Sequence, residues 1–130
     1  MSATVTNTVL VVEDDADTRH GLRVLLRAHD YEPVFATNAA DAITQSIEHD
    51  PDLILLDLGL PGVDGFQLLE HFGHRYVSMV PVIVLSGRER RKNRERALNA
   101  GAVSYLQKPW NDDELLELID RYSTRPPYAA

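Results

Sequence analysis

Several apolar runs in this chain lead directly into polar or charged residues. These polar residues are Glu13 and Asp14, then Asp57, then Ser86 and, reached through Gln107, Lys108. Neighbouring carboxylates repel one another, and a divalent cation removes that repulsion. The chain contains no Cys, and oxygen ligands without His or Cys beside them favour a hard ion, above all Mg²⁺. A metal, a lysine, a hydroxyl donor and a nucleophile are together what phosphoryl transfer requires.

Asp57 stands in the most informative stretch. Four apolar residues, Leu53 to Leu56, precede it, and a loop rich in Gly and Pro follows it. A short apolar run bounded by turn residues is typical of a strand buried on both faces of a parallel sheet. A carboxylate at the end of such a strand is costly to desolvate unless something pairs with it or binds it. Taken alone, Asp57 is read equally well as a site residue and as an ordinary acid that is solvated in a loop or caps a helix.

The elements that must position these residues are five strands alternating with five helices. The pattern predicts strands over 8–12, 31–36, 53–56, 82–85 and 103–106, and helices over 16–29, 39–49, 65–72, 88–100 and 112–122. Pro33 in the second strand predicts an edge position, because proline has no N–H to donate. Alternation of this kind predicts an α/β fold with a doubly wound parallel sheet and helices on both faces. The carboxyl ends of its strands lie along one edge, so the polar residues can converge there.

Length and composition place limits on the function. The 130 residues predict a single domain over 9–122, with an N-terminal extension over 1–8 and a tail or start of a linker over 123–130. No signal peptide and no run of the ~20 apolar residues that a membrane span needs is present, so a cytoplasmic location without membrane binding is expected. The net charge of −7 argues against direct nucleic-acid binding. The basic segment 88–96 is either a docking surface for an acidic partner or a solvated helix face.

Four motifs carry a resemblance to a known family. They are Val11-Val12-Glu13-Asp14-Asp15, Leu55-Leu56-Asp57-Leu58-Gly59-Leu60-Pro61-Gly62-Val63-Asp64-Gly65, Val84-Leu85-Ser86-Gly87 and Tyr105-Leu106-Gln107-Lys108-Pro109. In this order, each at a predicted strand end, they resemble the response-regulator receiver domain of bacterial two-component signalling. The resemblance runs from Val9 to Tyr122. It implies a flavodoxin-like receiver fold with strand order 2-1-3-4-5, the order of the chemotaxis receiver.

The resemblance implies a role for each matching residue. Asp57 would be the phosphoacceptor. The Mg²⁺ ligands would be Asp14, Glu13 (mainly through a bound water), Asp57 and the backbone carbonyl of Gly59. Two further residues, Ser86 and Lys108, would contact the phosphoryl group. The remaining expectations are a cis bond before Pro109 and a conformational switch made by Ser86 and Tyr105.

The resemblance also implies partners and an output. A sensor histidine kinase or a histidine phosphotransfer protein would donate the phosphoryl group. Phosphorylation would change the surface of the fourth helix, fifth strand and fifth helix, which would control a downstream effector domain or protein. Such a domain is not an enzyme beyond catalysing its own phosphorylation and dephosphorylation. The alternative is a Mg²⁺-dependent phosphohydrolase with an aspartate nucleophile, but that class needs a second acid two residues after the nucleophile, where this chain has Gly59.

Overall fold

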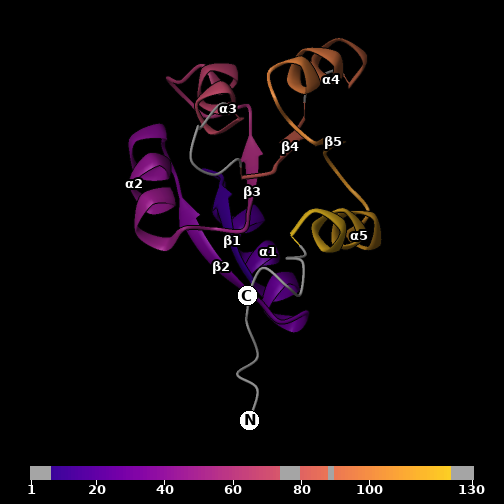
Figure 1. Cartoon of the computed structure of the whole chain (residues 1–130). Coiled ribbons are helices and arrows are strands. Elements are labelled where there is room, and N and C mark those ends of the chain that lie inside the picture. Colours follow the sequence, from indigo (N-terminus) through magenta and orange to yellow (C-terminus); the bar gives the residue numbers. More distant parts are fainter. Residues whose placement is uncertain (1–6, 74–79, 88–89, 124–130) are drawn as a thin grey trace, which may run out of the picture.

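The computed structural model describes residues 7–73, 80–87 and 90–123, and it contains one five-stranded parallel sheet (Figure 1). The strands are β1 (Asn7–Val12), β2 (Tyr31–Ala36), β3 (Leu53–Asp57), β4 (Val82–Ser86) and β5 (Ser104–Gln107). The helices are α1 (Ala16–Ala28), α2 (Ala39–His49), α3 (Gly65–Gly73), α4 (Arg90–Asn99) and α5 (Asp112–Ser123). The strand order β2-β1-β3-β4-β5 confirms the predicted fold, and it places Pro33 on an edge strand.

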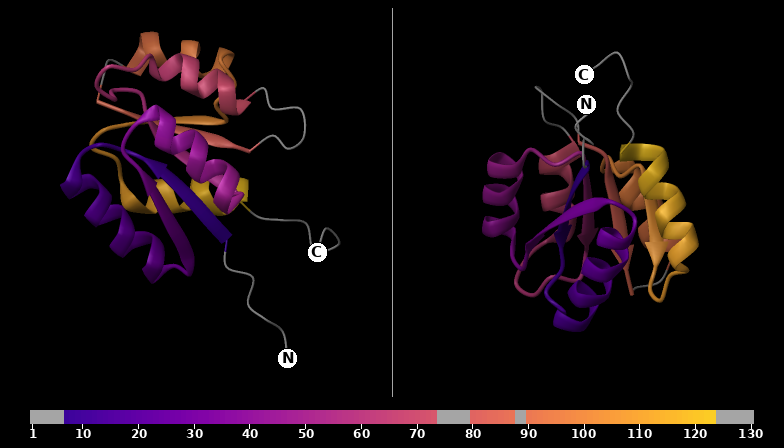
Figure 2. Two further views of the ribbon diagram at one scale, coloured as in Figure 1. Left: turned by 90° about the vertical axis from the view of Figure 1, so that its left-hand side faces the viewer. Right: turned by 90° about the horizontal axis from the view of Figure 1, so that it is seen from below.

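Helices cover both faces of the sheet (Figure 2). They enclose two separate cores of buried residues. Helices α2, α3 and α4 pack on one face, where Phe72 is the largest fully buried side chain. Helices α1 and α5 pack on the other face, through residues such as Leu22 and Leu115. Every residue of β3 and β4 is buried, as expected for central strands of a parallel sheet. The central strands therefore hold their carboxyl ends rigidly.

Side-chain caps begin the helices where the sequence predicts them. The Asp15 carboxylate accepts a hydrogen bond from the Thr18 N–H at 2.9 Å, and the Asn38 side chain accepts one from the Asp41 N–H at 2.8 Å. Asn111 caps α5 in the same way. Such caps satisfy N–H groups that lack a partner in the first helical turn. They fix where each helix leaves the edge of the sheet that carries the polar residues.

The two outer boundaries of the fold differ by one or two residues from the prediction. β1 begins at Asn7, inside the segment predicted as an extension, because Asn7 pairs with Tyr31 in the sheet. α5 includes Ser123, predicted as the first residue of the tail, because Ser123 is buried with its hydroxyl 3.4 Å from that of Tyr31. Between the predicted helix over 65–72 and the predicted strand over 82–85, residues 74–79 lie outside the described residues, as do residues 88 and 89.

Helix α4 differs from the other helices in having almost no apolar face. Among its residues from 92 to 99, Ala97 is buried, while Lys92, Arg94 and Arg96 are exposed. The helix ends in a Schellman motif, in which the N–H groups of Gly101 and Ala102 donate to carbonyls of the last turn. The exposure of these basic side chains is expected both for a docking surface and for a solvated face, so the two predictions stay open. None of the helices in the described ranges has the length and apolar character needed to cross a membrane.

Tyr31 supports a prediction about stability at high pH. Burial, together with the hydrogen bond that its hydroxyl donates to Asp120, raises the pKa of Tyr31 from 10.0 to about 12. The unfolded chain therefore loses this proton first, so the free energy of unfolding should fall as the pH rises from about 10 to about 12. Urea unfolding at several pH values checks this, with Tyr31→Phe as the control that lacks this pH dependence. A Tyr31 titration near the ordinary value, measured as the ultraviolet difference between wild type and Tyr31→Phe, would contradict it.

Candidate functional site

Strand register brings the predicted site residues together. Val12 pairs with Leu56, so the residues that follow them, Glu13 and Asp57, leave the sheet side by side. On the other side of β3, Asp57 itself pairs with Leu85. Ser86 ends β4 and pairs with Gln107, which Lys108 follows, and the Lys108 N–H donates to the Ser86 carbonyl at 2.8 Å. The four strand ends therefore converge at one edge of the sheet, as the sequence predicts.

Three carboxylates form the centre of this edge. One oxygen from each of Glu13, Asp14 and Asp57 lies within 4.8 Å of the others. Glu13 and Asp57 are buried, with relative exposures of 1% and 7%, whereas Asp14 is exposed. This open arrangement of oxygen atoms suits a hard divalent cation that keeps several of its waters. The fourth acid, Asp15, takes no part in the group, because its side chain caps α1.

Lys108 compensates part of this negative charge. Its Nζ lies 2.6 Å from Oε1 of Glu13 and 3.5 Å from Oδ2 of Asp57. Burial raises the pKa of Glu13 above its ordinary value, and the charge of Asp57 adds to this, although the hydrogen bond from Lys108 acts in the opposite direction. Burial lowers the pKa of Lys108, but its hydrogen bond to Glu13 and the charges of both acids outweigh this and raise it. The ammonium group is thus held in its charged form beside two buried carboxylates.

The loop after β3 directs the Asp57 carboxylate. The N–H of Gly59 donates to Oδ1 of Asp57 at 2.9 Å, so one oxygen is anchored while the other faces Lys108. Gly59 is exposed, and a Cβ added there would lie 3.4 Å from Oδ1 in ordinary contact. The loop then turns through Gly62, whose φ is +70°, before α3 begins. The carboxylate can therefore be reached from solvent past a residue without a side chain.

The side chains of Ser86 and Tyr105 lie on the face of the sheet that α2, α3 and α4 cover. The other face is covered by α1 and α5. Side chains alternate along a strand, so Ser86 shares the orientation of Val82 and Val84 in the core under α2, α3 and α4. Tyr105 belongs to this core, has a relative exposure of 4% and pairs with Val84. The two residues are thus diagonal neighbours on adjacent strands. The tyrosine ring is already directed inward in this structure.

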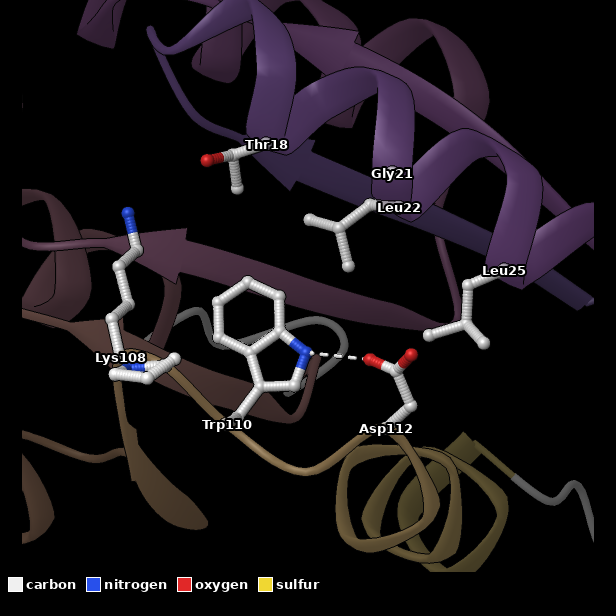
Figure 3. A pocket seen from close by; sticks show the side chains of 8 residues that line it. Thr18, Gly21, Leu22, Leu25, Lys108, Trp110 and Asp112 are labelled. Atoms are coloured by element: carbon white, nitrogen blue, oxygen red, sulfur yellow. Dashed lines mark hydrogen bonds between the residues drawn. The ribbon is translucent and has the colours of Figure 1, made fainter.

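A groove of about 460 Å³ opens beside Lys108, between α1 and the segment that joins β5 to α5 (Figure 3). Trp110 forms part of its wall, and its indole N–H donates to Asp112 at 3.2 Å. The peptide bond between Lys108 and Pro109 is cis. On the α1 side the groove is lined by Thr18, Gly21, Leu22 and Leu25.

One residue close to the site was not predicted from the sequence. Arg19 has the spacing of a polar helix face, but its guanidinium turns back toward the acids and donates to the backbone carbonyls of Glu13 and Asp14. An arginine one turn after a helix cap is a signal that could have indicated this contact. The pattern is weak because most arginines in that place are solvated.

Comparison with known proteins agrees with this geometry. The family model described as the response regulator receiver domain matches residues 9–120. The chain belongs to this family. Response regulator receiver domains are signalling domains of two-component systems, so the phosphohydrolase alternative is not favoured. The family match covers all four motifs and the whole of the sheet edge described above.

Individual relatives resemble the chain over most of its length. It is 40% identical over 108 residues to the transcriptional regulatory protein KdpE of Mycobacterium tuberculosis, covering 83% of the chain but 47% of that protein. The chain thus spans about half the length of this curated relative. A putative response regulator from Chloroflexus aurantiacus superposes with a TM-score of 0.85 at 28% identity, covering 92% of this chain and 99% of the other.

A second solved structure is similar to the chain and contains a metal. The receiver domain of sensor histidine kinase PA1611 from Pseudomonas aeruginosa superposes with a TM-score of 0.80 at 27% identity, covering 92% of this chain and 98% of the other. That protein holds a magnesium ion in its active-site cleft. The acidic group of this chain has the ligand chemistry that such an ion requires.

Proposed function

We propose that this domain is a phosphorylatable switch and that Asp57 accepts the phosphoryl group. The observation that carries the proposal is a largely buried carboxylate at a strand end, beside the exposed Gly59, whose N–H anchors one of its oxygens while Lys108 faces the other. A phosphohistidine on a kinase or phosphotransfer protein is the donor. An Asp57 oxygen bonds to phosphorus, the bond from phosphorus to the donor nitrogen breaks, and the imidazole leaves with that electron pair. The product is an acyl phosphate on Asp57 in a cytoplasmic signalling protein.

Glu13, Asp14, Asp57 and the Gly59 carbonyl are the groups that would hold Mg²⁺. The closeness of the three carboxylates supports this, as does the magnesium ion in the PA1611 receiver domain. The bound ion would supply positive charge against the negative charge of the phosphoryl oxygens. Lys108 adds a second positive charge that can contact a phosphoryl oxygen once the group has arrived.

Ser86 and Tyr105 would pass the change at Asp57 to the rest of the molecule. A Ser86 hydroxyl that moves toward a phosphoryl oxygen vacates space on the face where Tyr105 packs, because the two are diagonal neighbours. The equilibrium between two arrangements of α4, β5 and α5 would then shift. Helix α4 suits this role, because it buries little apolar surface of its own. The output would be an effector domain or a separate protein that reads this surface.

The experiment that tests the proposal uses acetyl phosphate, a small acyl phosphate, as the donor. Incubation with acetyl phosphate and Mg²⁺ should add one phosphoryl group per chain, seen as a mass increase that hydroxylamine removes. Omitting Mg²⁺ should prevent the labelling. Repeated turnover of a phosphomonoester without a stable labelled species would instead favour the aspartate-nucleophile hydrolase.

A further inference from the structure

Arg19 links the start of α1 to the end of β1. One guanidinium nitrogen, Nη1, lies 2.7 Å from the carbonyl oxygen of Asp14 and 3.1 Å from that of Glu13. Both carbonyls belong to the short turn between the strand and the helix, where the backbone hydrogen bonding of regular structure stops. Backbone carbonyls at such places need another donor. Arg19 supplies it from one turn along the helix, and its half-buried side chain lies across the turn.

The two acids depend on Arg19 to different degrees. Glu13 is held at many points: its N–H donates to the Ala36 carbonyl, and its carboxylate oxygens accept from Lys108 and from the Asp15 N–H. The carboxylate of Asp14 is exposed, so the orientation of its backbone decides which rotamers can bring it to the other two acids. Arg19 acts on that backbone. Loss of the guanidinium should therefore leave Glu13 nearly in place, while the peptide between Asp14 and Asp15 would lose the bond at its carbonyl and keep the one at its N–H, at 3.2 Å from Glu13.

We propose that Arg19 is a positioning residue that sets the Asp14 carboxylate for divalent-cation binding. This rests on the proposed function, because it takes the acidic group of Glu13, Asp14 and Asp57 to be a Mg²⁺ site. Groups that orient metal ligands without touching the metal change its affinity by about 10–100-fold when they are removed. Arg19 acts through the backbone of a ligand, so a loss of roughly 10-fold is expected.

The sign of the effect separates positioning from simple electrostatics. Arg19 is a positive charge near the site, and a positive charge repels Mg²⁺. If charge were its whole contribution, removing it would strengthen Mg²⁺ binding. If it positions Asp14, removing it weakens binding despite the lost repulsion. Arg23 is a matched control, because it carries the same charge one turn further along α1 but lies over the ring of Phe35, 4.8 Å from its centre.

The test is a calorimetric titration of the whole chain with Mg²⁺ alone. Arg19→Met should raise the Mg²⁺ dissociation constant roughly 10-fold, while Arg23→Met should leave it unchanged or slightly lower. Arg19→Lys keeps the charge and one donor nitrogen, so it should restore part of the affinity. If Arg19 had a merely structural role, its variants would have a changed melting temperature but not this order of Mg²⁺ dissociation constants. If Arg19→Met does not fold, the dissociation constant of Arg19→Lys still tests the proposal.

The second readout is the rate of labelling by acetyl phosphate at increasing Mg²⁺. For Arg19→Met the half-saturating Mg²⁺ concentration should rise, and the maximal rate should stay close to that of the wild type. If the wild type binds Mg²⁺ and Arg19→Met binds it equally or more tightly, the positioning role of Arg19 is overturned. The proposed function is then not affected. A wild type that neither binds Mg²⁺ nor becomes labelled overturns the proposed function, and the role of Arg19 with it.

Discussion

Replacing Asp57 with asparagine is expected to abolish labelling of this chain by acetyl phosphate. An amide oxygen in place of Oδ1 can still accept the Gly59 N–H, so the side chain keeps its place at the end of β3. The amide is a far weaker nucleophile than the carboxylate, and its nitrogen side carries no charge to attract Lys108. The fold should survive because the two side chains have nearly the same shape. Intact mass spectrometry after incubation with Mg²⁺ and acetyl phosphate measures the result.

Asp64→Asn is the matched control for this substitution. Asp64 stands in the same loop, is exposed and accepts a hydrogen bond from the Phe66 N–H at 3.0 Å. Asparagine caps helices about as well as aspartate, so the loop should keep its structure. The Asp64 variant should become labelled like the wild type. Labelling that persists in Asp57→Asn would show that another residue accepts the phosphoryl group, and the proposed role of Asp57 would then be wrong.

Replacing Gly65 with alanine should cause a clear loss of stability. Gly65 begins α3 and is buried, and an added Cβ would lie 2.7 Å from the carbonyl oxygen and 2.8 Å from the Cα of Leu58. Both atoms belong to the backbone, so a side-chain rotation cannot relieve the clash. Overpacking of this kind lowers the free energy of unfolding by about 1–3 kcal/mol. Because Leu58 directly follows Asp57, the labelling rate should fall as well.

The same substitution at Gly21 should have the opposite sign. Gly21 lies inside α1, and a Cβ added there would meet nothing within 4 Å. Alanine restricts the unfolded chain and favours the helix, so the free energy of unfolding should rise by about 0.5–1 kcal/mol. Urea denaturation of both variants checks the pair. A Gly65→Ala protein as stable as the wild type would mean that the loop after β3 shifts easily to accept the methyl group.

Local patterns were enough to predict the elements and the family. The apolar runs of β3 and β4, the caps Asn38 and Asn111, and the closing Gly101 depend on residues within a few positions of one another. The two outer boundaries were less predictable. Asn7 and Ser123 join the fold through Tyr31, which is distant from both in the sequence. Only pairing between distant segments could show that these residues are ordered parts of the domain.

The composition of the site was predicted from the sequence, and its geometry was not. That acids, a hydroxyl and a lysine end the strands follows directly from the sequence. Which of them touch depends on the parallel register that sets Glu13 beside Asp57 and brings Lys108 within 2.6 Å of Glu13. Helix periodicity placed Arg19 on a polar face, but its contact with the turn before α1 depends on how the chain leaves β1.

The sequence by itself therefore determined which elements form and which chemical groups stand at their ends, because periodicity, capping and motif spacing are local properties. The tertiary structure alone decided that Glu13, Asp14 and Asp57 share one space, that Lys108 pairs with two of them, and that Ser86 and Tyr105 lie together on one face. The physical reason is that parallel strands pair only across long stretches of intervening chain. Their register depends on the packing of two cores at once, and no short segment contains that information.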